Sequence, residues 1–499
     1  MFSPVTWPLP DLVTRRTAST PDRTALVDAG TGESWTYREL STGPVGGLAG
    51  GLAAWGVAPG DHLGVIADPG PRLAALVHAA ARVGCRLVPL APDAPAPALA
   101  ARCEAAAVTQ LLVPDGADAK VTAAFDGPVA SFDDVADGGP AVVPAEWGRD
   151  DDQWLVFTSG TTGSPRPVRL TAGNLVASAT ASARRLGVRP TDRWLACLPM
   201  HHVGGLAPVV RTALYGTAVV VQRGFDVEAT AAAMADHDVT HVSLVPTMLA
   251  RLLDGGWTPP ERLRCVLLGG APAPEALVER CEAAAVPVCP TYGMTETASQ
   301  LATAHPTEAF AHPGTVGRPL HGVELAVLDA TGRPVPPGEP GELVVSGPNV
   351  SPGYFGAEAA AAERFVDGAF RTHDRGRLDD GGRLRVLGRL DDAIHTGGET
   401  VQPADVESVL CDHAGVERAA VVGLPDEEWG EVVGALVVPT AGASFDPSAL
   451  RDHCRARLEP PAVPKVVVPA DALPRTASGT VDRPSVRERL GGARRHDGI

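Results

Sequence analysis

Lysine and long apolar runs are both scarce in this sequence of 499 residues. Of its 42 lysine and arginine residues, only Lys120 and Lys465 are lysine. No stretch approaches the roughly 18 consecutive apolar residues of a membrane-spanning helix. Residues 1–5 lack the basic segment before an apolar core that marks a signal peptide. The formal net charge of −17 argues against nucleic acid and anionic membranes as partners.

The cysteines lack the spacing of a disulfide framework or a zinc site. Eight of them are scattered along the chain, none in a C-x-x-C pair, and most lie in apolar surroundings. We therefore expect reduced thiols in the core of a cytoplasmic protein.

The rest of the composition is that of a soluble enzyme. Apolar residues make up 44% of the chain and charged residues 20%, which is far from the composition of a disordered protein. Residues 11–135 alternate apolar runs of strand length, such as 24–28, 62–66 and 85–90, with an Ala/Leu-rich helical stretch at 71–84. This alternation predicts an α/β fold with a parallel sheet, and the chain length predicts two or more domains.

A loop of small residues lies between two further predicted strands, 153–157 and 167–171. Its sequence is Thr158-Ser159-Gly160-Thr161-Thr162-Gly163. Such a loop can fold its amides and hydroxyls around a polyanion, because glycine tolerates a positive φ. The residues alone fit a hairpin turn equally well, and they do not form a Walker A motif, which requires Gly-Lys-Ser/Thr.

The loop resembles the phosphate loop of the adenylate-forming superfamily, which includes acyl-CoA synthetases, peptide-synthetase adenylation domains and luciferases. The segment Tyr292-Gly293-Met294-Thr295-Glu296 is similar to another signature of this superfamily. The resemblance implies that the Tyr292 ring lies along the adenine, that Thr295 reaches phosphate and that Glu296 helps to hold Mg²⁺. Carboxylate oxygens suit Mg²⁺, and an aromatic ring can stack on a purine.

A third block, residues 370–376, resembles the T-G-D segment of the superfamily, with His373 in place of the glycine. Taken alone, it would be a charged hairpin turn. The resemblance implies that Asp374 binds the ribose hydroxyls, that Arg389 contacts the ribose or a phosphate, and that Asp391 is a hinge between two domains.

The superfamily resemblance covers nearly the whole chain. It implies a large N-terminal domain of layered sheets and helices, residues 1–390, and a small mobile C-terminal α/β domain, residues 391–499. In the small domain we expect a helix that opens at 402–407, a strand at 419–423 and a helix from Asp446-Pro447 through Leu458.

The implied ligands are ATP, Mg²⁺, CoA and a small carboxylic acid, and the oligomeric state, including a homo-oligomer, stays open. The implied catalytic residues are Thr158, Arg166, Glu296 and Arg389, with Glu296 at the metal. The implied ATP-binding residues are Thr158, Ser159, Gly160, Thr161, Thr162, Gly163, Gly270, Ala271, Tyr292, Gly293, Thr295, Asp374 and Arg389. The implied acid-binding residues are His202, Arg211, Gly269 and Thr295, and those facing CoA are Gly397 and Gly398.

One position departs from the superfamily pattern. The superfamily ends with P-R-T-x-x-G-K, and its lysine bridges the acid and the α-phosphate; here Thr480 follows a matching 474–479. Threonine has no charge to offset negative charge on phosphorus. Four explanations stay open: slow adenylation supported by Mg²⁺, Arg166 and Arg475; replacement by Lys465; loss of the first half-reaction; or an engineered substitution.

Within the superfamily, the middle third of the chain most resembles the o-succinylbenzoate–CoA ligases of menaquinone synthesis. The segments that carry this similarity are 198–206, 243–249, 267–274 and 292–300. The implied reaction joins an acid to CoA through an acyl-adenylate and releases AMP and pyrophosphate. Because this acid has a second carboxylate, we expect a cation in its pocket. Arg211 is the candidate cation and His202 lines the pocket, although Arg211 fits a surface salt bridge equally well.

Two alternatives remain at this point. The chain could be another aryl or medium-chain acyl-CoA synthetase, which a panel of acids distinguishes. It could instead be a non-catalytic protein that binds nucleotide or acyl-adenylate, as Thr480 suggests; such a protein would bind ATP without releasing pyrophosphate.

Overall fold

The computed structural model describes residues 6–117, 124–136, 139–158, 165–396, 399–426, 428–476 and 480–497. The chain forms two compact units. The first comprises Met1–Leu325, Val344–Arg371 and Gly382–Leu384, and the second comprises Ala326–Leu343, Thr372–Gly381 and Arg385–Ile499. The expected hinge residue Asp391 lies within the second unit.

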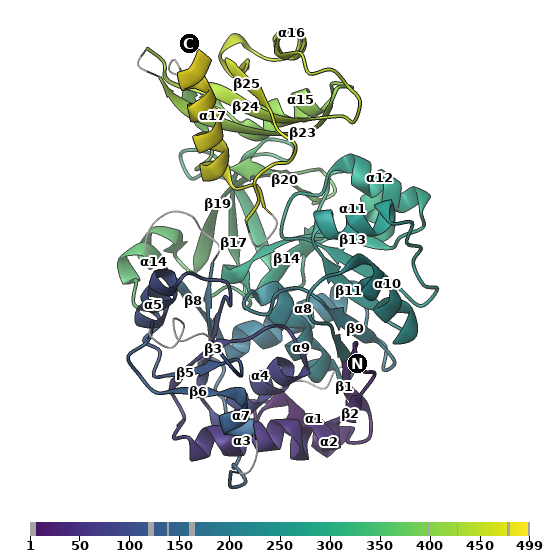
Figure 1. Ribbon diagram of the computed structural model, residues 1–499, viewed down its shortest axis with the longest axis vertical. Coiled ribbons are helices and arrows are strands. Elements are labelled where there is room, and N and C mark those ends of the chain that lie inside the picture. The colour runs from purple at the N-terminus through teal and green to yellow at the C-terminus, as the bar shows by residue number, and fades with distance from the viewer. Residues whose placement is uncertain are drawn as a thin grey trace. The chain divides into compact units, whose positions relative to one another are not determined.

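A nine-stranded sheet forms one half of the first unit (Figure 1). Its strand order is β15-β14-β13-β12-β11-β9-β10-β1-β2. The strands are β1 (Thr24–Asp28), β2 (Ser34–Thr36), β9 (Arg193–Ala196), β10 (Ala218–Val221), β11 (His241–Leu244), β12 (Cys265–Leu268), β13 (Val288–Met294), β14 (Ser299–Thr303) and β15 (Arg318–Pro319). The run from β13 to β1 is parallel, and the strands at both edges are antiparallel.

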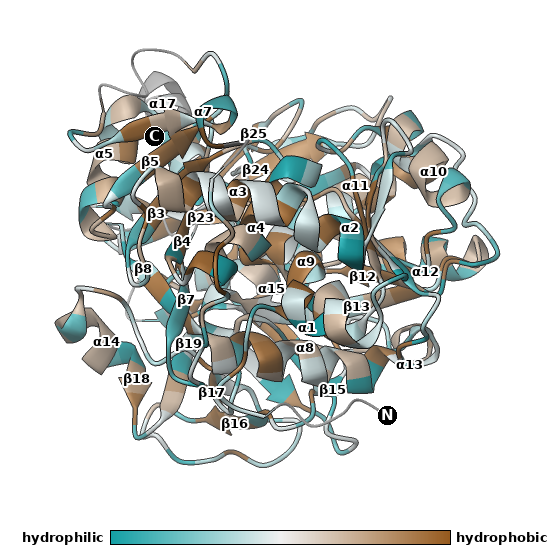
Figure 2. Ribbon diagram, turned by 90° about the horizontal axis from the view of Figure 1, so that it is seen from below, coloured by the Kyte–Doolittle hydropathy of each residue, from teal (hydrophilic) through white to brown (hydrophobic). Residues whose placement is uncertain are grey.

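A six-stranded sheet forms the other half, in the order β6-β5-β3-β4-β7-β8. The strands are β3 (His62–Ile66), β4 (Arg86–Leu90), β5 (Gln110–Val113), β6 (Val129–Ser131), β7 (Asp152–Phe157) and β8 (Pro167–Thr171). Only β8 pairs antiparallel, with β7. Strands of parallel sheets are covered on both faces and are therefore almost continuously apolar; accordingly β5 is coloured mainly as hydrophobic in Figure 2.

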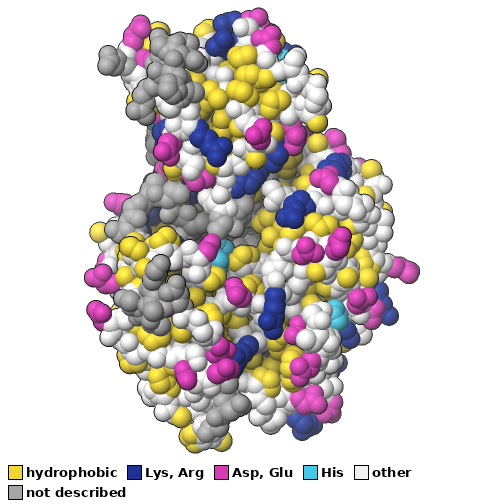
Figure 3. All heavy atoms as spheres, in the orientation of Figure 1, with side chains coloured by type: hydrophobic (Ala, Val, Ile, Leu, Met, Phe, Trp, Pro, Cys, Tyr) yellow, Lys and Arg dark blue, Asp and Glu magenta, His cyan; other side chains and the backbone are white. Residues whose placement is uncertain are grey.

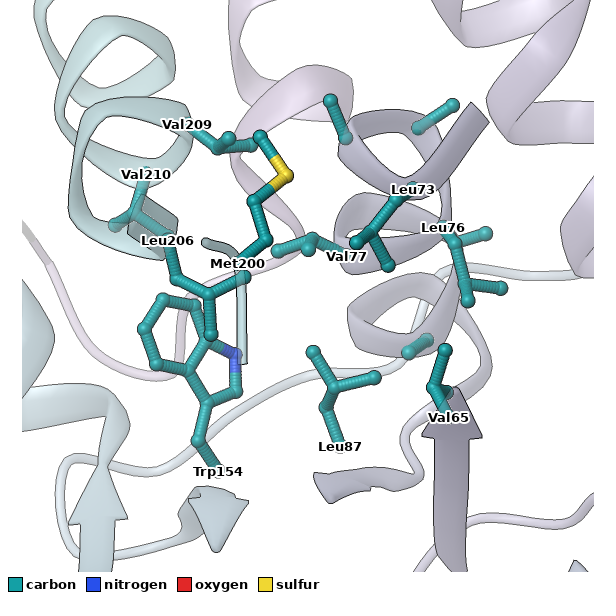
Figure 4. Packing of buried hydrophobic residues seen from close by; sticks show 14 of the residues in the cluster. Val65, Leu73, Leu76, Val77, Leu87, Trp154, Met200, Leu206, Val209 and Val210 are labelled. Carbon is teal, nitrogen blue, oxygen red and sulfur yellow. The ribbon is translucent and has the colours of Figure 1, made fainter. Parts of the chain in front are cut away.

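One buried cluster joins both sheets to the helices packed against them. The principal helices of the cluster are α3 (Pro44–Ala54), α4 (Pro71–Val83) and α9 (Val203–Tyr215). Figure 4 shows Met200 among side chains of α4 and α9, such as Val77 and Val209. The helix α8 (Ala172–Leu186) packs with α9 against β9, β12 and β13. The centre of the first unit is thus a helical layer in contact with two sheets.

The remaining helices of the first unit lie nearer its surface. The outer face of the nine-stranded sheet packs against α10 (Val227–Asp236), α11 (Pro246–Asp254), α12 (Glu275–Ala283) and α13 (Pro306–Ala311). The outer face of the six-stranded sheet packs against α5 (Ala96–Ala105). The others are α1 (Leu12–Ser19), α2 (Tyr37–Thr42), α7 (Phe132–Ala136) and α14 (Glu358–Arg364).

A five-stranded sheet contains residues of both units. Its order is β16-β17-β19-β18, and β20 pairs with β19. The strands are β16 (Glu324–Leu328), β17 (Gly341–Ser346), β18 (Phe365–Val366), β19 (Ala369–Leu378) and β20 (Leu384–Arg389).

The second unit has its own sheet and two cores. The strands are β21 (Ile394–Thr396), β22 (Glu399–Val401), β23 (Val416–Asp426), β24 (Gly430–Pro439) and β25 (Val466–Pro469). One core lies under α15 (Pro403–Cys411) and α16 (Pro447–Arg455), and the other under α17 (Arg483–Asp497). The α/β fold class is confirmed in both units.

The local predictions succeed where apolar runs meet clear end signals. The expected strands 24–28 and 62–66 are β1 and β3. Helix α4 begins at Pro71 and is capped at its C-terminus by Gly84, whose φ is +91°. The expected helix 447–458 was too long, because α16 ends at Arg455. The chain after it forms a tightened turn, in which the Arg457 amide donates to the Cys454 carbonyl at 2.9 Å.

All eight cysteines are free, as predicted, and seven of them are buried. In the described part of the chain, no helix is long and apolar enough to cross a bilayer. On the face drawn in Figure 3, basic side chains of the described residues are interspersed with acidic ones and do not form a continuous surface.

A buried ion pair joins three helices at the base of the first unit. Arg82 on α4 lies 3.3 Å from the Asp11 carboxylate, which also accepts the amide of Thr14 at the start of α1. Nη1 of Arg82 donates to the carbonyl of Ser41 in α2 at 2.7 Å. Both charged side chains are almost fully buried.

We therefore expect Arg82→Ala to lower the free energy of unfolding by about 3–5 kcal/mol, because Asp11 would stay buried without a counter-charge. Urea unfolding followed by fluorescence measures this loss. The control is Arg38→Ala, which removes an exposed pair with Asp22 and should cost less than about 1 kcal/mol. Equal losses of unfolding free energy in the two variants would contradict the stabilising role of the buried Arg82–Asp11 pair.

Candidate active site

The loop of small residues connects two paired strands. Phe157 at the end of β7 pairs with Pro167 at the start of β8, as the predicted strands required. Thr158 is half-buried at one end of the loop and Arg166 is exposed at the other. Residues 159–164, which include Ser159, Gly160, Thr161, Thr162 and Gly163, lie outside the described residues.

The carboxyl ends of β11, β12 and β13 meet at one edge of the nine-stranded sheet, where ligands bind in open α/β sheets. The turn after β12 carries Gly269, Gly270 and Ala271. The Gly269 amide donates to the carbonyl of Leu244 at 3.2 Å. A Cβ on Gly269 would lie 2.7 Å from a methyl group of Thr291, and Gly270 has a φ of +80°. This turn can therefore pack closely against β13 only if positions 269 and 270 are glycine.

The second signature forms a tight hairpin. Tyr292 and Gly293 lie on β13, and the 3₁₀ turn η1 (Thr295–Thr297) leads into β14. A Cβ on Gly293 would overlap the carbonyl of Ser299, so the two strands can approach only at glycine. The hairpin turns the Glu296 side chain inward, where only 8% of the residue is exposed.

Tyr354 connects the two signatures. Its hydroxyl donates to Oε1 of Glu296 at 3.0 Å, and its backbone forms a β-bridge with Val168 of β8, just after the phosphate-type loop. The amide of Ser351 donates to the Glu296 carbonyl at 2.8 Å. Burial and the nearby carboxylate raise the pKa of Tyr354, so the phenol stays protonated and donates. Thr158, Arg166 and Glu296 thus share one scaffold.

Tyr354 was not predicted from the sequence. The residue stands 58 positions after Glu296, in a segment that carries only turn signals. No local spacing relates it to the carboxylate that it holds.

Helix α9 carries both predicted acid-binding side chains. His202 is its N-cap residue, and its Nε2 is buried without a hydrogen-bond partner among the described residues. The ring lies 4.2 Å from that of His201. Burial lowers the pKa of His202 to about 4, so the imidazole is neutral near pH 7.

Arg211 lies nine residues, about two and a half turns of helix, further on and is only 2% exposed. Its guanidinium carbon lies 5.4 Å from the centre of the Trp194 ring. Within the described part of the chain, neither Nε nor Nη2 has a hydrogen-bond partner. Burial lowers the pKa of the guanidinium. Arg211 is therefore a buried cation without a counter-ion among the described residues, and the alternative of a surface salt bridge is wrong.

The second unit groups the other predicted residues. Nε of Arg389 lies 3.7 Å from Asp374, and its Nη2 lies 3.6 Å from Asp391. The Asp374 amide donates to the Thr372 hydroxyl at 3.0 Å. Gly397 and Gly398 lie outside the described residues. The structure thus forms two groups of expected site residues, one in each unit.

Thr480 contacts Thr476 in the second unit. Its hydroxyl lies 2.7 Å from that of Thr476, and its carbonyl accepts the Thr476 amide at 2.9 Å. The ammonium of Lys465 lies 4.4 Å from the centre of the Trp429 ring, so it already has a cation–π partner.

Comparisons with known proteins agree with this arrangement. Residues 13–355 match the AMP-binding enzyme family, and residues 405–480 match the AMP-binding enzyme C-terminal domain. The 2-succinylbenzoate–CoA ligase of Bacillus cereus strain Q1 is 37% identical over 96% of this chain and 98% of its own length.

Solved structures show the same similarity. The o-succinylbenzoate CoA synthetase (MenE) of Bacillus subtilis in complex with the acyl-adenylate intermediate OSB-AMP has a TM-score of 0.89 and 34% identity, over 96% of this chain and 98% of that one. The complex of that enzyme with ATP and magnesium ion has a TM-score of 0.88 and 34% identity, with coverage of 97% and 99%. The predicted superfamily resemblance is confirmed.

The lowered pKa of His202 predicts a pH effect on stability. An unfolded histidine binds a proton below about pH 6.5, whereas folded His202 binds one only near pH 4, so the unfolded state holds more protons between these values. Stability should therefore fall as the pH is lowered through this window. His202→Gln should make the fall shallower by about 1 kcal/mol per pH unit near pH 5, as measured by urea unfolding. An unchanged slope would contradict the burial of a neutral ring.

Proposed function

The chain belongs to the AMP-binding enzyme family, and we propose that it joins o-succinylbenzoate to CoA at the expense of ATP. In the first half-reaction a carboxylate oxygen of the acid attacks the α-phosphorus of ATP, and pyrophosphate leaves. In the second, the CoA thiol attacks the acyl carbonyl of the adenylate, loses its proton, and AMP leaves. Family membership, and relatives of that name aligned over nearly the whole chain, support the proposal.

The observation that carries the choice of acid is the unpartnered guanidinium of Arg211. Burying a charge without a counter-ion is costly, so such a site is expected to receive an anion. o-Succinylbenzoate carries a second carboxylate beside the one that reacts. We assign this second carboxylate to Nε and Nη2 of Arg211, the two nitrogens that lack protein partners. His202 is the N-cap residue of the same helix and offers a neutral Nε2.

On the nucleotide side, we assign Thr158 and Arg166 to the phosphates, together with Ser159, Gly160, Thr161, Thr162 and Gly163 of the same loop. Gly270, Ala271, Tyr292, Gly293 and Thr295 are assigned to ATP along the sheet edge, with Gly269 and Thr295 also at the acid. Asp374 and Arg389 are assigned to the ribose and a phosphate.

Glu296 suits the magnesium ion that accompanies ATP. Its carboxylate is a hard oxygen donor, and Tyr354 fixes its orientation through Oε1. Bound Mg²⁺ would neutralise charge on the phosphates. The contribution of this chain is to hold the carboxylate in one direction next to the loop that receives them.

The order of the half-reactions assigns a moving role to the small C-terminal domain, residues 391–499, which is part of the second unit. We propose that Asp391 is its hinge and that Gly397 and Gly398 face CoA in the second half-reaction. Asp391 has an exposed side chain, whereas its neighbour Asp392 is held by Arg483 at 2.9 Å. An exposed residue beside an anchored one fits a pivot.

The experiment for the activity is pyrophosphate release from ATP and Mg²⁺ with o-succinylbenzoate, with and without CoA, alongside benzoate and medium-chain acids. The proposal expects release with o-succinylbenzoate at the highest kcat/KM of the panel and a CoA thioester as product. Preference for another acid would assign the chain to a different acyl-CoA synthetase.

Thr480 favours a second candidate function of a different class. The protein would bind nucleotide or acyl-adenylate without catalysing formation of the adenylate. The hydroxyl of Thr480 contacts another hydroxyl where relatives of the superfamily place a cation. ATP binding without pyrophosphate release from any acid would support this candidate.

The assignment of Arg211 predicts a selective loss. Arg211→Met should lower kcat/KM for o-succinylbenzoate at least about 100-fold, because the second carboxylate would be buried without its cation. kcat/KM for benzoate, which has no second carboxylate, should change less than about threefold. The matched control is Arg251→Met. Arg251 lies in α11, and its guanidinium carbon is 5.2 Å from the centre of the Phe225 ring. Equal losses for the two acids would overturn the assignment.

The missing lysine predicts a gain. Thr480→Lys should raise the rate of adenylation at least about tenfold, because it supplies a positive charge to the phosphorus centre. Thr480→Ala removes the same hydroxyl without adding charge and serves as the control. Single-turnover formation of the acyl-adenylate separates this step from the CoA step. A gain in both variants, or in neither, would contradict an electrostatic cause.

A further inference from the structure

His373 has an unusual backbone conformation. Its φ is +55°, in the left-handed region that glycine adopts without strain and most other residues avoid. This is the position at which the superfamily has glycine. A strained residue persists when its surroundings hold it, and such strain clusters at functional positions.

The backbone around His373 is fixed by hydrogen bonds. The Leu390 amide donates to the His373 carbonyl at 2.7 Å. The hydroxyl of Thr372, the residue before it, donates to the Leu343 carbonyl at 2.8 Å. The conformation of His373 is therefore set by β17, β19 and the end of β20.

The side chain of His373 reaches the proposed hinge. Its Nδ1 lies 3.2 and 3.3 Å from the two carboxylate oxygens of Asp391. The left-handed backbone of His373 brings this contact about, since it aims the ring across the bend at Leu390. Arg389 approaches the same carboxylate only at 3.6 Å, so the imidazole is its nearer partner.

Asp391 lies between two held residues. The Leu390 amide is bound to β19, and Asp392 is bound to Arg483 of α17. Rotation about φ of Asp391 moves its carboxylate relative to His373, so the contact opposes this rotation.

We propose that His373 is a positioning residue that holds the Asp391 carboxylate and thereby slows rotation at the hinge. This proposal rests on the assignment of Asp391 as the hinge of the proposed ligase. All the contacts that support it lie within the second unit.

The test compares two isosteric variants, His373→Asn and His373→Asp. Both residues tolerate a left-handed backbone better than most. The amide nitrogen of asparagine lies two bonds from Cβ, as Nδ1 of histidine does, so it can donate to Asp391. Aspartate places a like charge there instead. The pair therefore changes the contact while it leaves backbone strain and side-chain size alike.

Hydrogen exchange of the Leu390 and Ala393 amides reports opening at the hinge, and the Leu458 amide in the α16 turn is the internal reference. His373→Asp should raise exchange at Leu390 and Ala393 at least about fivefold, whereas His373→Asn should stay within about twofold of the natural chain. Exchange at Leu458 should be unchanged in both. Equal exchange in the two variants would overturn the proposal.

A kinetic measurement adds the functional consequence. In single turnovers from preformed acyl-adenylate, the CoA-dependent step should be at least about twofold faster in His373→Asp than in His373→Asn; equal rates would overturn the role in catalysis. If the natural chain forms no adenylate with any acid, the proposed ligase function fails, and the exchange experiment still tests the contact by itself.

Discussion

The burial of Arg211 is the constraint around which the proposed acid-binding side of the first unit is arranged. The guanidinium lies over the Trp194 ring, among helix α9 and the residues of β9, β12 and β13. Two of its nitrogens have no partner among the described residues. A cation in this position disfavours an acid whose far end is apolar and favours one that ends in a carboxylate.

The proposed nucleotide-binding side of the first unit depends on a weaker interaction, the hydrogen bond from the Tyr354 hydroxyl to Glu296. It joins the hairpin of the second signature to the strand that follows the phosphate-type loop. The glycines at 269 and 293 allow the backbones to approach closely enough for this to happen. The chemistry therefore depends on backbone contacts that only glycine permits.

The sequence predicted the elements with clear local signals. β1 and β3 follow from apolar runs, α4 from Pro71 and Gly84, and the antiparallel β7–β8 pair from the two runs around the Thr/Gly loop. The end of α16 was misplaced because its last turn tightens after Arg455, where no glycine or proline marks the end of the helix.

The candidate site was predictable only as far as its motifs. Tyr354 could not be found, since its partner is 58 residues away and nothing in the intervening sequence relates them. Whether Arg211 was a surface residue or a buried cation depended on the packing of α9 against two other layers. The glycine of the superfamily at position 373 signals a left-handed backbone, but no residue pattern relates the His373 side chain to Asp391.

The most direct test of the central claim is calorimetric binding of o-succinylbenzoate and of its analogue without the second carboxylate, with no nucleotide present. We expect the dicarboxylate to bind at least about tenfold more tightly, and this difference to disappear in Arg211→Met. Equal affinities in the natural chain would mean that Arg211 does not receive the acid, and the choice of substrate would lose its physical basis.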